Sequence, residues 1–433
     1  MQFHYDGVMS RENIFTIDTS SIKFGNGCTE EVGYEARRFG IENAMIVTDR
    51  VISKLPLFEK ALKSLEKENI KYSVFDRVSV EPTDTSFREA SQFAIDGNFD
   101  GIIAIGGGSS MDTAKGANLY STYPADFLDY VNAPIGKGIR VPGPLKPCIC
   151  IPTTAGTGSE TTGGAIFDLE EMHAKTGLSD RFLRPSVGII DPENIKTMPR
   201  MVAACSGFDV LCHGIESYTA MPFSDRESPD NPGERPAYQG SNPVSDVWSM
   251  RTIEVVSQNI VESINDPENK EARESMMLAA SAAGVGFGNA GVHLPHGMSY
   301  AVSGNVKEFT PEGYPQGKPI VPHGLSVILN APAVFRFTSS SNPEKHLKAA
   351  SLLGVDTSNI EGKDAGNAIA DKLIELLREL DMPNGLSGLG YTEGDVETLV
   401  KGTLPQHRVT KLSPIPVEKK DFEMLFSESL KLW

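Results

Sequence analysis

The stretch GIIAIGGGSSMD, residues 101–112, joins a short apolar run to a glycine-rich turn and a following helical pattern. An isoleucine-rich run of this length is typical of a strand buried on both faces of a parallel sheet. Glycines directly after such a strand let the backbone approach a pyrophosphate, and the next helix directs free N–H groups at it. The run lacks the G-x-G-x-x-G spacing, so a plain strand–helix turn explains these residues equally well.

Similar apolar runs lie on both sides of this stretch, at residues 44–47, 72–75, 148–151 and 187–190. Helix-sized segments separate them, which predicts a mostly parallel sheet covered on both faces. After about residue 200 the pattern becomes helical, as in residues 369–380, where leucines recur at 3.6-residue spacing. We therefore expect an α/β Rossmann-like domain over residues 1–200 and an all-α domain over residues 201–433.

Two further helices are expected at residues 244–264 and 275–283. Between the helical segments lie two stretches rich in Pro and Gly, residues 222–243 and 305–319. Both are predicted to be long loops, and long loops inside compact domains are often functional.

A second polar turn, PTTAGTGSE at residues 152–160, follows another predicted strand. Two such turns at the carboxyl ends of neighbouring strands form the crevice that a dinucleotide needs. Asp49 also ends a strand, where its carboxylate would accept a hydrogen bond from a ribose hydroxyl and repel a 2′-phosphate, favouring NAD over NADP. Capping of the next helix is an equally good interpretation of Asp49.

The composition narrows the classes of function. The formal charge is −17, which argues against nucleic acid or an anionic membrane surface as a partner. No apolar run approaches the length of a membrane span, and five cysteines, an odd number, do not form a disulfide framework. The first residues show no secretory or transit pattern, so we expect a cytoplasmic protein; a mitochondrial form with its presequence removed would look the same.

Four of the eight histidines lie between residues 213 and 323, together with a well-placed aspartate. Asp209 and His213 are four residues apart, which puts both side chains on one face of a helix. His296 and His323 can complete the site. Three imidazoles and one carboxylate suit Fe(II), Zn(II), Ni(II) or Mn(II) when water or substrate fills the remaining positions.

Taken together, these motifs in this order resemble the iron-containing alcohol dehydrogenase family over essentially the whole chain. The resemblance implies a Rossmann-like domain and a helical domain, as in dehydroquinate synthase-like folds, with a metal–NAD site in the cleft between them. It implies metal ligation by Asp209, His213, His296 and His323. The nucleotide contacts that it implies come from Asp49, Gly106, Gly107, Gly108, Ser109, Asp112, Thr153, Thr154 and Thr157, with Lys175 near the cofactor.

Two features depart from many alcohol dehydrogenases of this family. Tyr300 stands where these have a proton-relay histidine in H-G-M-x-H, and residues 305–319 lengthen the link between His296 and His323. Both departures, with residues 238–243 and 401–406, resemble the hydroxyacid-oxoacid transhydrogenase branch, whose substrates are acids such as 4-hydroxybutyrate and 2-oxoglutarate. Tyr300 and His293 are candidate catalytic residues for hydrogen bonding or proton relay.

Substrates that carry carboxylates require a cation in the cleft, and a bidentate arginine is the natural partner. The basic residues in or near the irregular stretches are Arg235, Lys307, Lys318 and Arg408. The sequence does not choose among them.

Three other functions stay open at this point. The first is an NAD-linked alcohol dehydrogenase that releases NADH in each turnover, and the second is a metal-dependent lyase resembling dehydroquinate synthase. The third is a binding module without catalysis. By family analogy we also expect a homo-oligomer.

Overall fold

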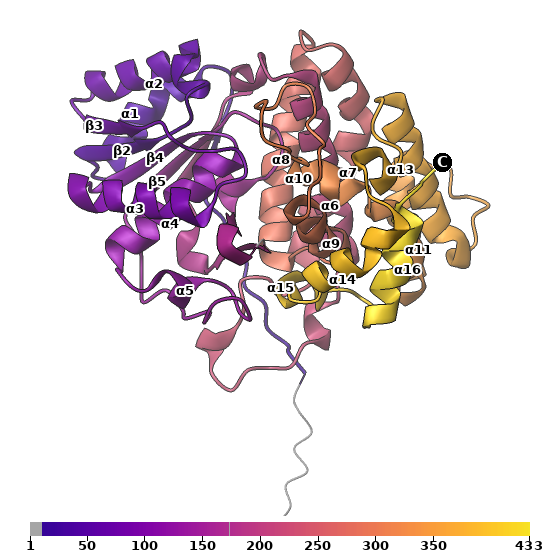
Figure 1. Ribbon diagram of the computed structural model, residues 1–433. Helices are drawn as coiled ribbons and strands as arrows, with labels where there is room; N and C mark the ends of the chain where they lie inside the picture. The colour runs from indigo at the N-terminus through magenta and orange to yellow at the C-terminus, as the bar shows by residue number, and fades with distance from the viewer. Residues whose placement is uncertain (1–10, 173) are drawn as a thin grey trace, which may run out of the picture.

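The computed structural model describes residues 11–172 and 174–433. It places an α/β part and a helical part side by side (Figure 1). The first ten residues, on which the prediction about targeting signals rests, lie outside the described residues. Within the described residues, no helix combines the length and the hydropathy that a membrane crossing requires. All five cysteines are buried free thiols, as expected.

The α/β part is built on a parallel sheet. In the described chain its six strands have the order β1-β8-β5-β4-β2-β3. Their bounds are β1 Ser21–Phe24, β2 Asn43–Val47, β3 Lys71–Phe75, β4 Gly101–Gly106, β5 Cys148–Pro152 and β8 Val187–Ile190. All five strands predicted from the apolar runs are therefore present. The sequence analysis missed β1 and an antiparallel hairpin of β6 Gly164–Leu169 and β7 Ala174–Ser179.

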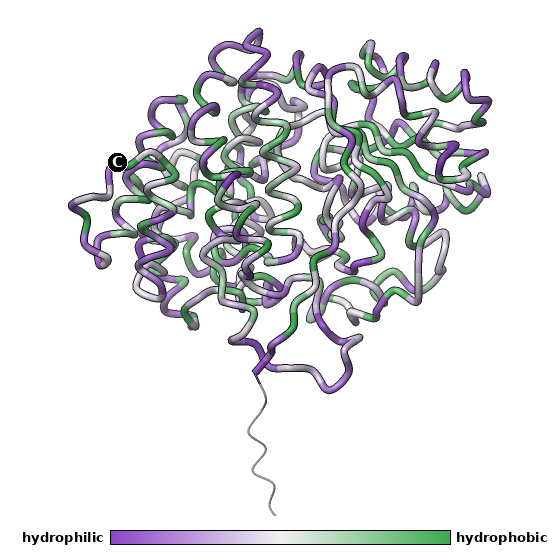
Figure 2. Tube along the Cα trace, turned by 180° about the vertical axis from the view of Figure 1, so that it is seen from behind, coloured by the Kyte–Doolittle hydropathy of each residue, from purple (hydrophilic) through white to green (hydrophobic). Residues whose placement is uncertain are grey.

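Helices cover both faces of this sheet, so alternate residues of one strand enter two different cores. Ile103 and Ile105 of β4 pack with helices α1 (Val32–Arg38) and α2 (Pro56–Lys67). Ile102 and Ala104 pack with helices α3 (Asp84–Gly97) and α4 (Gly108–Thr122). The strands appear as a hydrophobic band in Figure 2. Burial on both faces explains why these runs are continuously apolar rather than alternating.

The helical part forms one core around the buried helix α6. A short helix α5 (Phe127–Tyr130) belongs to the α/β part. The remaining helices are α6 Arg200–Thr219, α7 Pro243–Asn265, α8 Lys270–Ala290, α9 Leu294–Gly304, α10 His323–Ile328, α11 Ala331–Thr338, α12 Pro343–Leu352, α13 Ala365–Glu379, α14 Val396–Thr403, α15 His407–Thr410 and α16 Lys419–Ser429. The helices predicted near residues 244–264, 275–283 and 369–380 correspond to α7, α8 and α13.

Residues 305–319 form an irregular loop, as predicted. Residues 222–242 are mostly irregular but contain two short 3₁₀ turns. The domain boundary near residue 200 stays a prediction. Helix α6 begins at Arg200, but the chain start also contacts the helical part: the Thr16 N–H donates to Gln239 Oε1 at 2.9 Å and the Asp18 N–H to Asn289 Oδ1 at 2.9 Å.

Candidate functional site

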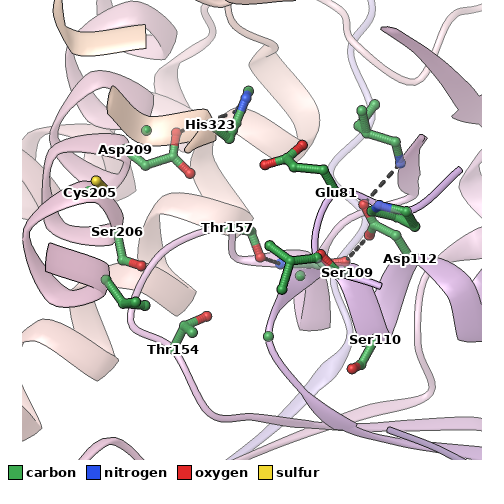
Figure 3. Close-up of a pocket in the computed structure, with 18 of the residues that line it drawn as sticks. Glu81, Ser109, Ser110, Asp112, Thr154, Thr157, Cys205, Ser206, Asp209 and His323 are labelled. Carbon is green, nitrogen blue, oxygen red and sulfur yellow. Dashed lines mark hydrogen bonds and ion pairs between the residues drawn. The ribbon is translucent and has the colours of Figure 1, made fainter. Parts of the chain in front are cut away.

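A cavity of about 460 Å³ lies between the carboxyl edge of the sheet and helices α6, α9 and α10. Every sequence-predicted site residue lines it except Gly106 and His293. In the close-up, Asp209 and His323 lie together on the helical side, Ser109 and Asp112 on the sheet side, and Glu81 extends into the space between them (Figure 3). We call these two sides the helical wall and the sheet wall.

The sheet wall is made by the two polar turns, which adjacent strands bring together. Gly106 at the end of β4 is in register with Pro152 at the end of β5. The turns touch closely: a Cβ on Gly108 would lie 2.6 Å from Thr157 Cγ2. Helix α4 starts here without a side-chain cap, so its first N–H groups and its dipole can bind an anion such as pyrophosphate.

Two aspartates of the sheet wall already have protein partners. Asp49 Oδ1 accepts from the N–H groups of Val51 and Ile52, at 2.7 and 2.9 Å. Asp112 accepts from Ser159 Oγ at 2.6 Å and from the Ile166 N–H at 2.9 Å, one bond to each oxygen. Asp49 therefore holds the turn that leads into the next helix, although it is not the N-cap residue of that helix. Its nucleotide contact and that of Asp112 stay predictions.

Lys175 is held by two carboxylates that the sequence analysis did not single out. Its buried Nζ pairs with Glu81 and lies 3.0 Å from Asp168 Oδ1. Burial alone would lower the pKa of Lys175, but Asp168 and Glu81 hold it above its usual value. Glu81 has φ 53°, a left-handed conformation that is strained for a residue before proline. No sequence signal marks this strain, because Glu81 looks like an ordinary loop residue.

The helical wall brings the four predicted metal ligands together. Asp209, His213 and His296 offer ligand atoms that all lie within 4.8 Å of one another. From Asp209 Oδ1 the distances to the Nε2 atoms of His213, His296 and His323 are 3.7, 3.4 and 3.8 Å. The carboxylate therefore sits at the centre of the three imidazoles.

Three separate helices create this cluster. Asp209 and His213 lie one turn apart in α6, His296 lies in the first turn of α9, and His323 is the first residue of α10. Helix α10 reaches α6 because residue 324 is glycine. A Cβ there would lie 1.9 Å from the Cys205 carbonyl oxygen and 2.8 Å from Asp209 Cβ. His213 is fixed by stacking on Phe287, with ring centroids 3.9 Å apart.

Three potential ligands of the helical wall differ in charge state: Asp209 is ionised and His213 is neutral, whereas His296 carries a proton that a metal would have to displace. Burial would raise the pKa of Asp209, but His213 and the other two imidazoles hold it below its usual range. Burial lowers the pKa of His213 to about 3, so this imidazole is neutral at pH 7. Burial would also lower the pKa of His296, but Glu216 and Asp209 raise it to about 9.

Glu216 orients His296, a role that the sequence analysis missed. Glu216 Oε1 lies 2.6 Å from His296 Nδ1, and its Oε2 accepts from the His293 N–H at 2.8 Å. A carboxylate behind Nδ1 leaves Nε2 free to bind a metal. The signal was present in the sequence, because Glu216 follows His213 by three residues on the same helix.

The residues present fit a metal ion. Asp209 Oδ1 and His296 Nε2 are buried and have no hydrogen-bond partner in the described chain, although they face each other at 3.4 Å. Buried polar atoms without partners are rare in native structures, and a cation between them would satisfy both. The nitrogen and oxygen donors suit Fe(II) and neighbouring divalent metals.

The two candidate catalytic residues differ in position. Tyr300 lines the cavity, and its hydroxyl accepts a hydrogen bond from Arg408 Nη2 at 2.8 Å. Burial raises the pKa of Tyr300, so the phenol is protonated at neutral pH, and its catalytic role stays a prediction. His293 does not line the cavity: its ring is fully buried, with Nε2 3.3 Å from Thr219 Oγ1. Its role in hydrogen bonding or proton relay stays a prediction.

Of the four cations considered for a carboxylate, only Arg408 lines the cavity. Arg235 pairs with Glu12 at 2.8 Å, Lys307 pairs with Asp395 at 2.7 Å, and Lys318 is exposed.

The fold and the site together define an oxidoreductase that combines a nucleotide crevice with a metal centre. The model of the family "Iron-containing alcohol dehydrogenase" matches residues 19–192, and that of the "Fe-containing alcohol dehydrogenase family, C-terminal" matches residues 237–430. The chain therefore belongs to the iron-containing alcohol dehydrogenase family, whose members act on CH–OH groups. This family implies a metal, NAD(H) and small-molecule substrates.

Curated relatives extend over nearly the whole chain. The chain is 52% identical to the mitochondrial hydroxyacid-oxoacid transhydrogenase of Bos taurus over 421 residues, covering 97% of this chain and 90% of the relative. For the Homo sapiens protein of the same name the identity is 51%, with the same coverage. Because these relatives are named mitochondrial, the prediction of a cytoplasmic protein gains no support from them.

Solved structures confirm the fold class. A 1,3-propanediol oxidoreductase superposes with a TM-score of 0.84 at 26% identity, covering 96% of this chain and all of the other. An alcohol dehydrogenase from Oenococcus oeni gives 0.84 at 24% identity, covering 96% of this chain and all of the other.

Proposed function

We propose that this chain is a hydroxyacid-oxoacid transhydrogenase that moves hydride between an acid such as 4-hydroxybutyrate and one such as 2-oxoglutarate. One observation carries the proposal: the helical wall, with one carboxylate among three imidazoles, faces an uncapped helix N-terminus across a single cavity. The names of the relatives, at about half identity over nearly the whole chain, support the choice of substrates.

In this proposal Asp209, His213, His296 and His323 hold Fe(II), and the sheet wall holds NAD. When bound, the metal supplies Lewis acidity that lowers the pKa of an alcohol, and NAD supplies a hydride carrier. Glu216 keeps the Nε2 of His296 directed at the metal position. The free N–H groups at the start of α4 bind the pyrophosphate, and Thr154 and Thr157 close the turn around it.

The two half-reactions balance without a net change in cofactor. The hydroxy acid would pass a hydride to the nucleotide and a proton to solvent, and would leave as an aldehyde acid. The oxo acid would then enter the same cavity, take the hydride back together with a proton from solvent, and leave as a hydroxy acid. Tyr300 stays protonated through both steps, because burial raises its pKa, and orients the reacting group by hydrogen bonding.

The test uses purified protein with 4-hydroxybutyrate, deuterated at C4, and 2-oxoglutarate, without added NAD. We expect mass spectrometry to find 2-hydroxyglutarate that carries deuterium at C2, formed over many turnovers. Turnover that appears only when NAD is supplied contradicts the transhydrogenase. Metal content is measured on the same sample, and iron at about one atom per chain is expected.

A second candidate is an ordinary alcohol dehydrogenase, which the similarity to 1,3-propanediol oxidoreductase favours. It differs in releasing NADH in every turnover. Free NADH that accumulates in proportion to the oxidised alcohol, with no need for an oxo acid, identifies this alternative.

We also propose that the chain forms a homo-oligomer and that it works in the cytoplasm or, as the names of its relatives favour, in mitochondria. Light scattering after size-exclusion chromatography tests the first, and localisation of the tagged native protein tests the second.

A further inference from the structure

Arg408 is a cavity residue whose charge has no carboxylate partner in the described chain. Its Nη2 donates to the Tyr300 hydroxyl, while its Nη1 is buried and has no hydrogen-bond partner in the described chain. Over residues 11–172 and 174–433, no carboxylate lies within ion-pair distance of this guanidinium. Burying a charge without a counter-ion is costly, and an anion that enters the cavity would supply the missing partner.

Other enclosed arginines of this chain show the usual arrangement. Arg184 lies 3.5 Å from Asp18, and Arg235 pairs with Glu12 at 2.8 Å. Lys175, the other cation of the cavity, is neutralised by Glu81 and Asp168. Arg408 is therefore the cation in this cavity that can accept a carboxylate without first breaking an ion pair.

Arg408 is linked to the predicted metal ligand His323 through Tyr300, which contacts both residues. The Tyr300 ring stacks on the His323 ring, with centroids 6.2 Å apart and planes at 17°. On its other side Arg408 lies over the Tyr238 ring, with Cζ 5.1 Å from the centroid. The two tyrosines contact the guanidinium, and neither forms a hydrogen bond to its Nη1.

Three stretches that set this sequence apart from common alcohol dehydrogenases meet here. Tyr300 replaces the usual relay histidine of the family, Tyr238 lies in the stretch 238–243, and Arg408 follows the stretch 401–406. Their side chains are separated by up to 170 residues in the chain but contact one another.

We propose that Arg408, oriented by Tyr300 and Tyr238, binds the carboxylate that hydroxy acid and oxo acid have in common. This inference rests on the proposed function. In 4-hydroxybutyrate two methylenes separate the carbinol carbon from the carboxylate, and in 2-oxoglutarate two methylenes separate the ketone carbon from the distal carboxylate. One anchor therefore places either reacting carbon at the same point of the cavity, so both half-reactions use one site.

The first test compares Arg408→Ala with wild type in steady-state kinetics. We expect KM for 4-hydroxybutyrate and for 2-oxoglutarate to rise by about 100-fold, because a charge-assisted contact with the carboxylate is lost. KM for 1-butanol, which lacks the carboxylate, should stay within about twofold. Arg378→Ala, the same substitution at an exposed position of α13, is the matched control and should behave as wild type. Equal losses for acids and alcohol overturn the proposal.

The second test measures binding without reaction. Glutarate keeps the distal carboxylate of 2-oxoglutarate but has no oxo group, and its dissociation constant is measured by calorimetry on the protein as purified. Arg408→Ala should weaken glutarate binding by about 100-fold, and Arg408→Lys, which keeps the charge but not the fork, should recover part of it. Unchanged glutarate binding in Arg408→Ala overturns the anchor.

The two tests separate this inference from the proposed function. If the wild type fails to transfer deuterium between the two acids, the proposed function fails, while the glutarate measurement still decides whether Arg408 binds carboxylates. If deuterium is transferred but glutarate binds equally well to wild type and Arg408→Ala, the proposed function is supported and the role of Arg408 in carboxylate binding is rejected.

Discussion

The two walls of the cavity are built in opposite ways. The sheet wall consists of two short turns, each continuous in sequence, and works through backbone N–H groups, glycines and hydroxyls. The helical wall consists of single side chains from α6, α9, α10 and α15, spread over about 200 residues. The comparison suggests that nucleotide binding depends on local turns, whereas the metal and the substrate depend on how helices pack.

The largest expected effect comes from Asp209→Asn, which removes the central charge of the helical wall. We expect the metal to be lost and kcat/KM to fall by about 10³-fold, because the Lewis acid goes with it. Metal analysis and kinetics measure this effect. Nucleotide affinity should stay within a few-fold of wild type, and a parallel loss of nucleotide binding contradicts the independence of the two walls.

Gly108→Val is the reciprocal change in the sheet wall. Even the Cβ would lie 2.6 Å from Thr157 Cγ2, so the turns must move apart and the N–H groups lose their geometry. We expect nucleotide affinity, measured by fluorescence titration, to fall by about 100-fold with normal metal content. Gly394→Ala is the control, because its Cβ would meet only Thr392 Oγ1 at 3.6 Å. Normal nucleotide binding in Gly108→Val shows that the turn does not hold the nucleotide.

Glu216→Gln tests whether orientation of His296 matters. The amide keeps the shape but loses the carboxylate that lies 2.6 Å from His296 Nδ1. We expect metal affinity to fall by about 10- to 100-fold, measured by competition with a chelator, while nucleotide affinity is unchanged. Full metal affinity in this variant means that packing alone orients the ring.

The smallest effect is expected from Arg235→Ala, which changes stability rather than catalysis, because Arg235 does not line the cavity. The hydrogen bond from Arg235 lowers the pKa of Glu12 below its usual value. The ion pair therefore stabilises the fold fully at pH values above the pKa that Glu12 has in the unfolded chain, about 4.3. This stabilisation is lost as the pH falls through the lower pKa that Glu12 has in the folded protein. We expect Tm to drop by about 2–4 °C at pH 7, with a smaller difference below pH ~4. An increase in KM for hydroxy acids contradicts the choice of Arg408.

Prediction from sequence succeeded where the signal was local. The apolar runs gave β2, β3, β4, β5 and β8, because burial on both faces of a sheet demands continuous apolar residues. It failed for the hairpin β6–β7, whose strand Gly164–Leu169 alternates and includes Asp168. The left-handed Glu81 also carries no local signal.

The residues of the site also differ in whether a local sequence pattern could predict their position. Asp209 and His213 could be paired from their spacing, since one helical turn places them on one face. Their meeting with His323 depends on the close approach of α10 to α6. His293 and His296 look equivalent in sequence, but only His296 lines the cavity.

The sequence by itself determined five of the strands (β2, β3, β4, β5 and β8), the two polar turns and the Asp209–His213 pair, because hydrogen-bond geometry and helical or sheet periodicity act over a few residues. The tertiary structure alone decided which cation stays unpaired, because pairing depends on which side chains approach across long chain separations. Arg235 and Arg408 have the same charge and similar loop surroundings in the sequence. In the folded chain Arg235 forms an ion pair with Glu12, whereas Arg408 lines the cavity and its Nη1 has no hydrogen-bond partner among the described residues.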